Sequence, residues 1–456
     1  MLKKNQEYII KISGMTGEGN GVGRTDEGFA VFVPETAPGD LAKVKIAKAN
    51  KSFAFAILLE ILRPSPDRIK PDCPVYKKCG GCCFRHVSYA AELKIKESFV
   101  RENLKKIGAL DAPVLPVIPS PKENAYRNKA QYPIGLGESG KIITGFFAKR
   151  SHRLINCPEC ALQPGIFAQI AGEFCNFAGQ YKISAYDETK HTGLLRHLYI
   201  RYGEASGEIA VCIVANGTCL PMRNELVSRL TGRFPDIKTI VLNINREKTN
   251  VILGKKYINL LGDGSIKDWL CGLEFNLSPP SFYQVNHGGA ETLYKTAEEF
   301  AELSGGETLL DLYCGTGTIG LSMARRVKKV VGVEIIPEAI ENARRNAWLN
   351  GITNAEFILG DAGEAAAGLE KRGLKPDLII LDPPRKGCSP EVLETAARLF
   401  PGKIVMISCD SATLARDLKI FGGLGYRTVK IQPVDMFPRT AHIETVALLV
   451  NTREAH

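Results

Sequence analysis

The feature that most constrains the fold is an alternation of apolar and helical segments in the last third of the chain. Apolar stretches over residues 308–312, 329–334, 355–359, 377–381 and 403–408 predict strands, and helical patterns lie between them. The clearest helix runs from Pro337, a residue suited to a first helical turn, to Asn350, just before Gly351. This alternation predicts a doubly wound parallel sheet with helices on both faces.

The first of these strands leads into a glycine-rich turn. Residues 308–320 read TLLDLYCGTGTIG, so an apolar run with Asp311 is followed by Gly315, Gly317 and Gly320. A strand, a tight loop and a helix start in this order are typical of a nucleotide-binding turn. The motif alone is weak, because the chain has 44 glycines and the same spacing would fit a nicotinamide site or an ordinary turn.

Acidic residues lie where the predicted strands end. Ligands of such sheets bind beyond the carboxyl ends of the strands, and Asp311, Glu334, Asp361 and Asp382 occupy or closely follow these positions. Glu334 is placed to accept hydrogen bonds from both hydroxyls of a ribose. Two prolines and Arg385 follow Asp382, whereas an aromatic residue after this sequence is familiar from enzymes that methylate amines. Nitrogen methylation is therefore disfavoured.

Two further reactive side chains are predicted at the same edge. Cys409 follows the strand 403–408, and Glu444 precedes an apolar run that would return as a strand beside residues 427–431. A strand-end cysteine is often only a packing residue. A carboxylate flanked by apolar residues is costly unless it is paired or acts as an acid or base, which favours a chemical role for Glu444.

The N-terminal segment has the pattern of a small antiparallel barrel. Short alternating runs at residues 8–12, 29–33, 42–47 and 53–61 are separated by glycines and prolines. Basic residues cluster between Lys43 and Lys51, with Phe53 and Phe55 just beyond, a combination that suits phosphate contact and base stacking. A solvated lysine edge over two core phenylalanines is an equally good interpretation of this segment alone.

A cysteine cluster follows the barrel. Cys73, Cys79 and Cys82 have the spacing C-x5-C-x2-C, and Cys160 is the expected fourth ligand. Four thiolates hold an iron–sulfur cluster or zinc. The spacing differs from the C-x3-C-x2-C of radical S-adenosylmethionine enzymes, so radical chemistry is not expected. Cys157 is the main competitor for the fourth position.

The middle of the chain predicts a mixed α+β region with a basic, aromatic-rich segment. A helix with a basic outer face is expected over residues 91–108, and strands and helices over about 180–277. Between them, residues 122–153 interleave aromatic and basic side chains, which suits single-stranded RNA, although the edge of an ordinary sheet would look similar.

Length, charge and apolar content limit the number of domains, the kind of partner and the compartment that fit this chain. A chain of 456 residues suggests two or three domains, and its formal charge of +10 favours a polyanionic partner. No apolar segment reaches the length of about 20 residues needed to cross a bilayer, and the start lacks a secretory apolar core. We expect a cytoplasmic, monomeric protein without a membrane partner, in which the thirteen cysteines stay reduced.

Several motifs together resemble one family. The segments DLYCGTGTIG, DPPRKG, SCD and HIET, in this order after FYQVN, are similar to RNA uracil-5-methyltransferases, and the run GEGNGVGRTDEGFAVFVPETAPGD resembles the RNA-binding TRAM domain. The nearest pattern is that of 23S rRNA (uracil-5-)-methyltransferases. The chain departs from it at Asp410-Ser411, where relatives often have Asn-Pro, and at Thr318, where some have Asn. These two differences do not alter the expected chemistry, but they leave open which subgroup of the family the chain resembles.

The resemblance implies an α/β protein with three domains. These would be an OB-like TRAM β-barrel over residues 1–66, a central α+β domain with an iron–sulfur site over 67–277, and a Rossmann-like methyltransferase domain over 278–456. The helix near 91–108 would pack on the last of these. Four cysteines would hold a [4Fe-4S] cluster, with zinc as a less favoured occupant: Cys73, Cys79, Cys82 and Cys160.

The same resemblance assigns the chemistry. Cys409 would be the nucleophile and Glu444 the base, and four residues would contact S-adenosylmethionine: Gln284, Tyr313, Glu334 and Asp382. The substrate would be a uridine of RNA, with 23S rRNA favoured over tRNA. A non-catalytic RNA-binding or ribosome-assembly factor and a base-amine methyltransferase are the alternatives. The presence of Cys409, Glu444 and the glycine loop argues against the non-catalytic factor.

Overall fold

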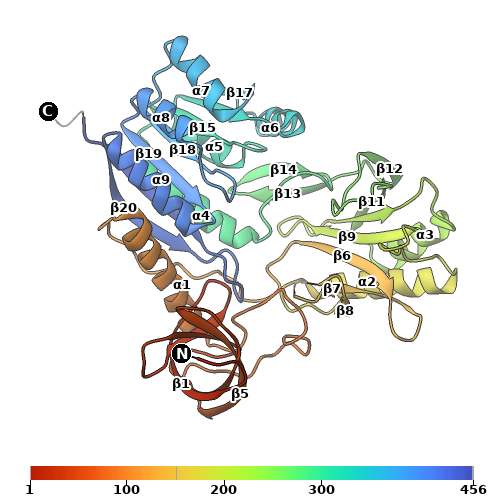
Figure 1. Ribbon diagram of the computed structural model, residues 1–456. Coiled ribbons are helices and arrows are strands. Elements are labelled where there is room, and N and C mark those ends of the chain that lie inside the picture. The colour runs from red at the N-terminus through yellow and green to blue at the C-terminus, as the bar shows by residue number, and fades with distance from the viewer. Residues whose placement is uncertain (1, 150, 454–456) are drawn as a thin grey trace.

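The structure, a computed structural model, describes residues 2–149 and 151–453. Its strands form a closed barrel and separate β-sheets (Figure 1). The barrel lies next to α1, the central sheet lies to the right in Figure 1, and the C-terminal sheet lies above α1. Among the described residues no helix combines the length and the apolar character that a membrane span requires.

The N-terminal strands close into the expected barrel. Their order around the ring is β1-β2-β3-β5-β4, and they comprise β1 (Glu7–Met15), β2 (Asn20–Arg24), β3 (Ala30–Pro34), β4 (Leu41–Ala49) and β5 (Phe53–Arg63). The prediction of a wholly antiparallel barrel is wrong, because β3 and β5 are parallel. A closed ring of five strands cannot alternate direction at every step, so at least one pair must be parallel.

The central part is a seven-stranded sheet with helices on one face. Its order is β12-β11-β10-β9-β6-β7-β8, and only β10 and β11 are parallel neighbours. The helices α2 (Gly165–Gln180) and α3 (Arg223–Arg233) pack on one face through a shared apolar core. The strands are β6 (Lys129–Leu136), β7 (Ile142–Phe147), β8 (Leu154–Asn156), β9 (Leu195–Tyr202), β10 (Ile209–Ala215), β11 (Ile237–Ile244) and β12 (Lys256–Leu261). A hairpin of β13 (Ile266–Leu270) and β14 (Leu273–Leu277) follows.

The C-terminal part is the predicted doubly wound sheet. Its order is β17-β16-β15-β18-β19-β21-β20, and the first five strands are parallel. These strands are β15 (Thr308–Leu312), β16 (Lys329–Glu334), β17 (Ala355–Leu359), β18 (Leu378–Leu381) and β19 (Lys403–Ser408). The last two, β20 (Tyr426–Val434) and β21 (Glu444–Asn451), form the expected antiparallel pair, and β21 also pairs antiparallel with β19.

Apolar cores lie on both faces of this sheet. Successive residues of each buried strand belong to different cores: Leu309 and Ile380 to one, Leu310 and Ile379 to the other. The covering helices are α4 (His287–Ala301), α5 (Thr318–Met323), α6 (Pro337–Leu349), α7 (Ala362–Lys371), α8 (Pro390–Arg398) and α9 (Ser411–Gly423), with a short 3-10 turn η2 (Ala324–Arg326) after α5.

An N-terminal helix joins the second core. Helix α1 (Tyr89–Asn103) continues into a π-helical turn, η1 (Leu104–Gly108), and both lie against α9. Val100 and Leu104 are buried in the same core as Leu310. A segment that precedes the central sheet in the sequence therefore packs on the C-terminal sheet. The domain boundaries near residues 66 and 277 stay predictions.

Candidate active site

The glycine loop after β15 is held by two carboxylates. Asp311 is 1% exposed, and its Oδ2 accepts a hydrogen bond of 3.0 Å from the Gly320 amide. Glu334, at the end of β16, accepts from the Gly315 amide through Oε2 at 3.1 Å, and its Oε1 accepts from the Ile335 and Ile336 amides. The loop and the neighbouring strand end are thus fixed to each other, with the Glu334 carboxylate held at the sheet edge.

The described geometry at Glu334 suits a ribose. Its two oxygens accept three backbone hydrogen bonds, which leaves acceptor capacity because a carboxylate can accept about four. Beside it, Ile335 and Ile336 are 61% and 52% exposed. Exposed apolar side chains next to a preorganised carboxylate form a surface that fits an aromatic base attached to a ribose.

Other predicted methyl-donor residues lie around the same edge. Gln284 precedes α4, and its main-chain oxygen accepts 2.8 Å from Asn128 Nδ2. The pKa of Tyr294 is raised by burial and by the charge of Asp382, and its hydroxyl lies 3.2 Å from Thr318 Oγ1 and within hydrogen-bonding reach of the Gln284 side chain. Gln284, Thr318 and Asp382 therefore gather around one buried hydroxyl.

Tyr313 has an unusual backbone conformation in the loop. Its φ is +68°, in the left-handed region that residues other than glycine rarely adopt. The half-buried ring packs against the core on the α7–α9 side, and the neighbouring Cys388 thiol contributes to a raised tyrosine pKa. A strained residue at a strand end is consistent with a functional turn, and its predicted contact with a methyl donor stays a prediction.

Cys409 and Glu444 lie at the same end of adjacent strands. The last pair of β19 and β21 at this end is Ser408 with Thr445, so the next residues outward, Cys409 and Glu444, are neighbours across the strand ends. The charge of Glu444 contributes to raising the pKa of Cys409, after burial, to about 11. Glu444 is 5% exposed, and burial, with help from Asp382, raises its pKa to about 8.

Arg385 is a member of this site that the sequence did not single out as functional. Its positive charge lowers the pKa of both Cys409 and Glu444 and so opposes the effect of burial. Asp382, three residues earlier, has a pKa raised by burial to about 7. The signal in the sequence was a cation three residues after the strand-end acid, because a positive charge near a cysteine favours the thiolate.

The cysteines predicted to bind a cluster line one cavity of about 180 Å³. Cys73, Cys79, Cys82, Cys157 and Cys160 surround it, and neighbouring thiols raise one another's pKa values. Over the described residues, however, no group of three or more His, Cys, Asp or Glu side chains is arranged to hold a metal ion. The cluster is therefore not shown, and five thiols facing one cavity are a donor set that fits an iron–sulfur cluster. Both Cys157 and Cys160 stay candidates for the fourth ligand.

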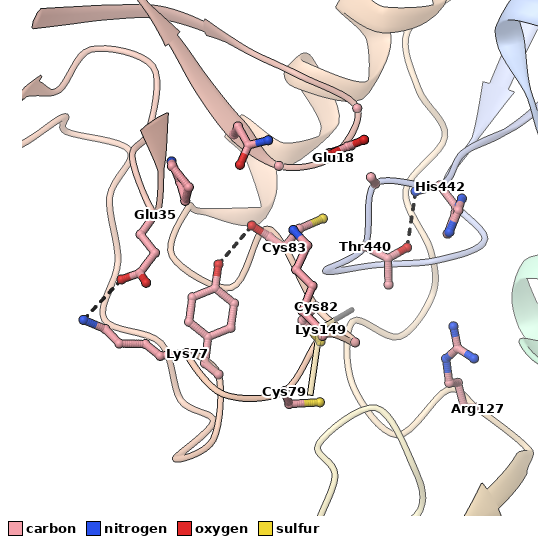
Figure 2. Close-up of a pocket in the computed structure, with 18 residues that line it drawn as sticks. Glu18, Glu35, Lys77, Cys79, Cys82, Cys83, Arg127, Lys149, Thr440 and His442 are labelled. Atoms are coloured by element: carbon pink, nitrogen blue, oxygen red, sulfur yellow. Dashed lines mark hydrogen bonds and ion pairs between the residues drawn. The ribbon is translucent and has the colours of Figure 1, made fainter. Parts of the chain in front are cut away.

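A second pocket of about 410 Å³ connects the barrel, the cysteine loop and the segment before Glu444 (Figure 2). Glu35 and Lys77 form an ion pair of 3.2 Å on one side, whereas Arg127 and His442 lie on the opposite side. Burial lowers the pKa of His442, and the charges of Arg385 and Arg127 lower it further. The pocket is thus lined on this side by the segment that precedes Glu444.

Comparisons with known proteins agree with this architecture. Residues 88–452 match the model of the tRNA (uracil-5-)-methyltransferase family, and residues 2–59 match the TRAM domain. Uncharacterized RNA methyltransferases are similar: that of Halalkalibacterium halodurans is 43% identical over 449 residues, 98% of each chain, and that of Clostridium tetani is 42% identical over 448 residues, 98% of this chain and 97% of the relative.

A solved structure is similar over nearly the whole chain. The tRNA (uracil-54, C5)-methyltransferase of Pyrococcus abyssi, in complex with S-adenosyl-L-homocysteine, is 29% identical, covers 98% of this chain and 100% of its own, and has a TM-score of 0.77. Family model, relatives and structure point the same way, and the chain belongs to the RNA uracil-5-methyltransferase family of enzymes.

Proposed function

We propose that the protein methylates carbon 5 of a specific uridine in 23S rRNA through a covalent adduct between Cys409 and carbon 6 of the base. The observation that carries this proposal is the position of Cys409 beside Glu444 at the ends of β19 and β21. A buried carboxyl with a pKa of about 8 next to a thiol, within reach of Arg385, supplies a nucleophile and a base in one place.

The reaction requires both side chains. Carbon 5 of uracil is a weak nucleophile, so the Cys409 thiolate adds to carbon 6 and gives carbon 5 the character of an enolate carbon. Carbon 5 then takes the methyl group. Glu444 removes the remaining proton from carbon 5, and the electron pair of that bond expels the thiolate and restores the double bond. The positive charge of Arg385 favours the thiolate, since it lowers the pKa of Cys409.

Four residues would hold the methyl donor: Gln284, Tyr313, Glu334 and Asp382. S-adenosylmethionine supplies an electrophilic methyl group when it is bound. Glu334, fixed by three backbone amides, would accept hydrogen bonds from the ribose, and Asp382 would orient the donor beside Cys409. The solved relative from Pyrococcus abyssi, which contains S-adenosyl-L-homocysteine, supports this choice of cofactor.

A [4Fe-4S] cluster would be held by Cys73, Cys79, Cys82 and Cys160, with zinc as the second choice. The shared cavity supports a common ligand for these thiols, whereas Cys83 lines the neighbouring pocket instead. Structural support of the RNA-binding region is the role we propose for the cluster. Protein purified under anaerobic conditions is expected to be brown and to contain iron and inorganic sulfide.

RNA containing 5-fluorouridine tests the covalent step. Fluorine at carbon 5 cannot leave as a proton does, so the wild-type protein should become trapped on the RNA after methyl transfer. Cys409→Ala should form no adduct, whereas Cys388→Ala, which removes another thiol near Tyr313, should still be trapped. Adduct formation by Cys409→Ala at the wild-type rate would exclude the proposed nucleophile.

Transfer RNA is the second candidate substrate. It is favoured by the tRNA-specific solved relative, whereas the overall motif pattern resembles that of 23S rRNA enzymes. Mapping 5-methyluridine in rRNA and tRNA from a deletion strain separates the two. Loss of a 5-methyluridine from 23S rRNA is expected, and a loss confined to tRNA would contradict the favoured substrate.

A further inference from the structure

The face of the central sheet opposite α2 and α3 is covered by a loop rather than by helices: Tyr199, Cys212, Val214 and Val241 pack there against Ile252 and Leu253. On β6 and β9, Ala130 and Ile200 are partners and face the core under α2 and α3. The adjacent pair, Lys129 and Arg201, must face the other way, because successive residues of a strand alternate between faces. Two cations are therefore direct cross-strand neighbours, about 5 Å apart at their Cβ atoms, an arrangement that is unfavourable unless something compensates it.

The arginines at this place have hydrogen-bond donors without acceptors. Arg201 is 2% exposed, and its Nη2 donates 2.7 Å to the Ser281 carbonyl, but Nε and Nη1 are buried and have no partner in the described structure. The Nε of Arg127, just before β6, is also buried without a partner. Because these atoms are buried, a ligand cannot contact them directly, but each unpaired donor adds uncompensated positive charge to this place.

The charges at this place are not balanced within the described residues. None of Arg127, Lys129 and Arg201 forms an ion pair with a carboxylate there, although the structure contains many such pairs elsewhere. Burial and the charges of Arg201 and Arg127 lower the pKa of Lys129 to about 8. Three cationic side chains repel one another here and are partly removed from water. A polyanion would relieve this repulsion and would therefore bind favourably.

The three cations lie beside the predicted methyl-donor segment. Arg127 forms an isolated bridge with Asn286, and the Asn128 side chain donates to the Gln284 carbonyl. Arg127 also lines the pocket that reaches His442, as Figure 2 shows. A ligand on these cations would therefore continue toward Cys409 and Glu444.

We infer that Arg127 and Lys129, with the buried charge of Arg201 beside them, form a phosphate-binding site for the RNA strand next to the target uridine. The inference rests on the proposed function and names the part of the substrate that this face of the sheet takes. The carboxylate of the methyl donor is the other available anion, but one negative charge would leave most of this cationic group uncompensated. Successive phosphodiesters of one strand match it better.

The variant Lys129→Gln tests the site, with binding of a fluorescein-labelled single-stranded RNA of mixed sequence as the readout. We expect the Kd to rise about tenfold at low salt and the slope of log K against log salt to fall by roughly one. The affinity for S-adenosylmethionine, measured by calorimetry, should be unchanged. Lys238→Gln, which removes an exposed lysine at the start of β11, is the matched control and should leave both affinities as in the wild type.

The outcomes are distinct. An unchanged RNA affinity and salt slope would overturn the inference, and so would a loss of S-adenosylmethionine affinity with RNA binding intact, which would assign the cations to the methyl donor. Lys129→Arg keeps the charge and should restore RNA affinity; a failure to do so would show a structural role and would also overturn it. Because this probe contains no particular target uridine, a wrong choice of substrate RNA or nucleophile would appear in the 5-fluorouridine and mapping experiments instead.

Discussion

The proposed base, Glu444, can be separated from the proposed nucleophile, Cys409, by one substitution. In Glu444→Gln the thiol of Cys409 is kept, so addition to carbon 6 and methylation remain available, but the proton on carbon 5 has no acceptor. We expect turnover to fall by about three orders of magnitude and a methylated protein–RNA adduct to accumulate with ordinary, unfluorinated RNA.

A denaturing gel and the mass of the released nucleotide measure this adduct. Glu394→Gln, an exposed carboxylate on α8, is the control and should turn over normally. An inactive Glu444→Gln without any adduct would instead place Glu444 before or during the attack of Cys409.

The same residue predicts a pH dependence of stability. The pKa of Glu444 is raised to about 8 by burial, so the folded state prefers the protonated carboxyl. Its stabilising contribution is complete below the unfolded pKa near 4.5 and is lost as the pH rises through 8. Glu444→Gln should therefore be more stable than the wild type by roughly 1–3 kcal/mol at pH 9, with little difference near pH 4.5. Thermal melting at both pH values measures this difference. An equal gain in stability at both pH values would contradict burial of the charged Glu444 carboxylate as the cause.

Single residues differ in how far the sequence predicts them. The acids at strand ends could be located because each lies beside or within an apolar run, and Asp382 and Glu444 do lie near Cys409. The pairing of Lys129 with Arg201 could not, since it depends on the register of two strands that are about 70 residues apart. The effect of Arg385 on two pKa values likewise requires the folded loop.

At the scale of the elements, the contact between β15 and α5 depends on Gly320. A Cβ at this position would lie 2.9 Å from Asp311 Oδ2 and 3.0 Å from Val330 Cγ1, so Gly320→Ala must push the helix away from the strand. We expect a loss of about 1–3 kcal/mol in unfolding free energy and weaker binding of S-adenosylmethionine. Calorimetry and chemical denaturation measure the two effects.

Gly172→Ala is the matched control for this substitution. Gly172 lies inside α2, where an added Cβ meets nothing within 4 Å, so alanine should stabilise the protein by up to about 1 kcal/mol. Equal changes in unfolding free energy in the two variants would show that the close approach of Gly320 to Asp311 does not affect stability.

The attachment of α1 to the C-terminal sheet rests on a buried charge network. Lys96 Nζ lies 2.7 Å from both Glu92 Oε1 and Asp435 Oδ1, and all three side chains are fully buried. Lys96→Met removes the cation shared by two buried carboxylates, of which Glu92 keeps a pair of 3.6 Å with Arg439, and should cost about 3–5 kcal/mol. Lys106→Met breaks the exposed pair with Glu102 and should cost no more than about 0.5 kcal/mol. Denaturant unfolding compares them, and similar losses would contradict the role of burial.

The elements show where sequence patterns stop being informative. The five parallel strands were predictable because each is a short, mainly apolar run between helices. Strand β2 was not, since its sequence NGVGR looks like a loop. A Cβ at Gly21 would lie 2.0 Å from Thr36 Oγ1, and one at Gly23 would lie 2.3 Å from Ile10 Cγ2, so the glycines that mark a turn in the sequence serve close contacts inside the barrel.

On the scale of the whole molecule, the cysteine loop is joined to the segment that leads to the base. The amides of Cys83 and Phe84 donate 3.0 and 3.2 Å to the Arg439 carbonyl, and the Tyr126 hydroxyl donates 3.0 Å to the Pro438 carbonyl. Asp435, at the start of this segment, binds Lys96 of α1. Residues 435–443 are therefore held from the N-terminal half of the chain, and Glu444 follows directly.

This connection predicts that loss of the proposed cluster would affect the candidate active site. In Cys79→Ser the protein should lose iron and sulfide, and hydrogen exchange at residues 435–443 should become faster because the loop that holds the Arg439 carbonyl is no longer fixed. Cys219→Ser, which changes an exposed thiol, should keep both iron and slow exchange. Loss of iron with unchanged hydrogen exchange at residues 435–443 would show that the cluster stabilises only its own loop. Stoichiometric zinc without iron in the wild type would contradict the proposal of an iron–sulfur cluster.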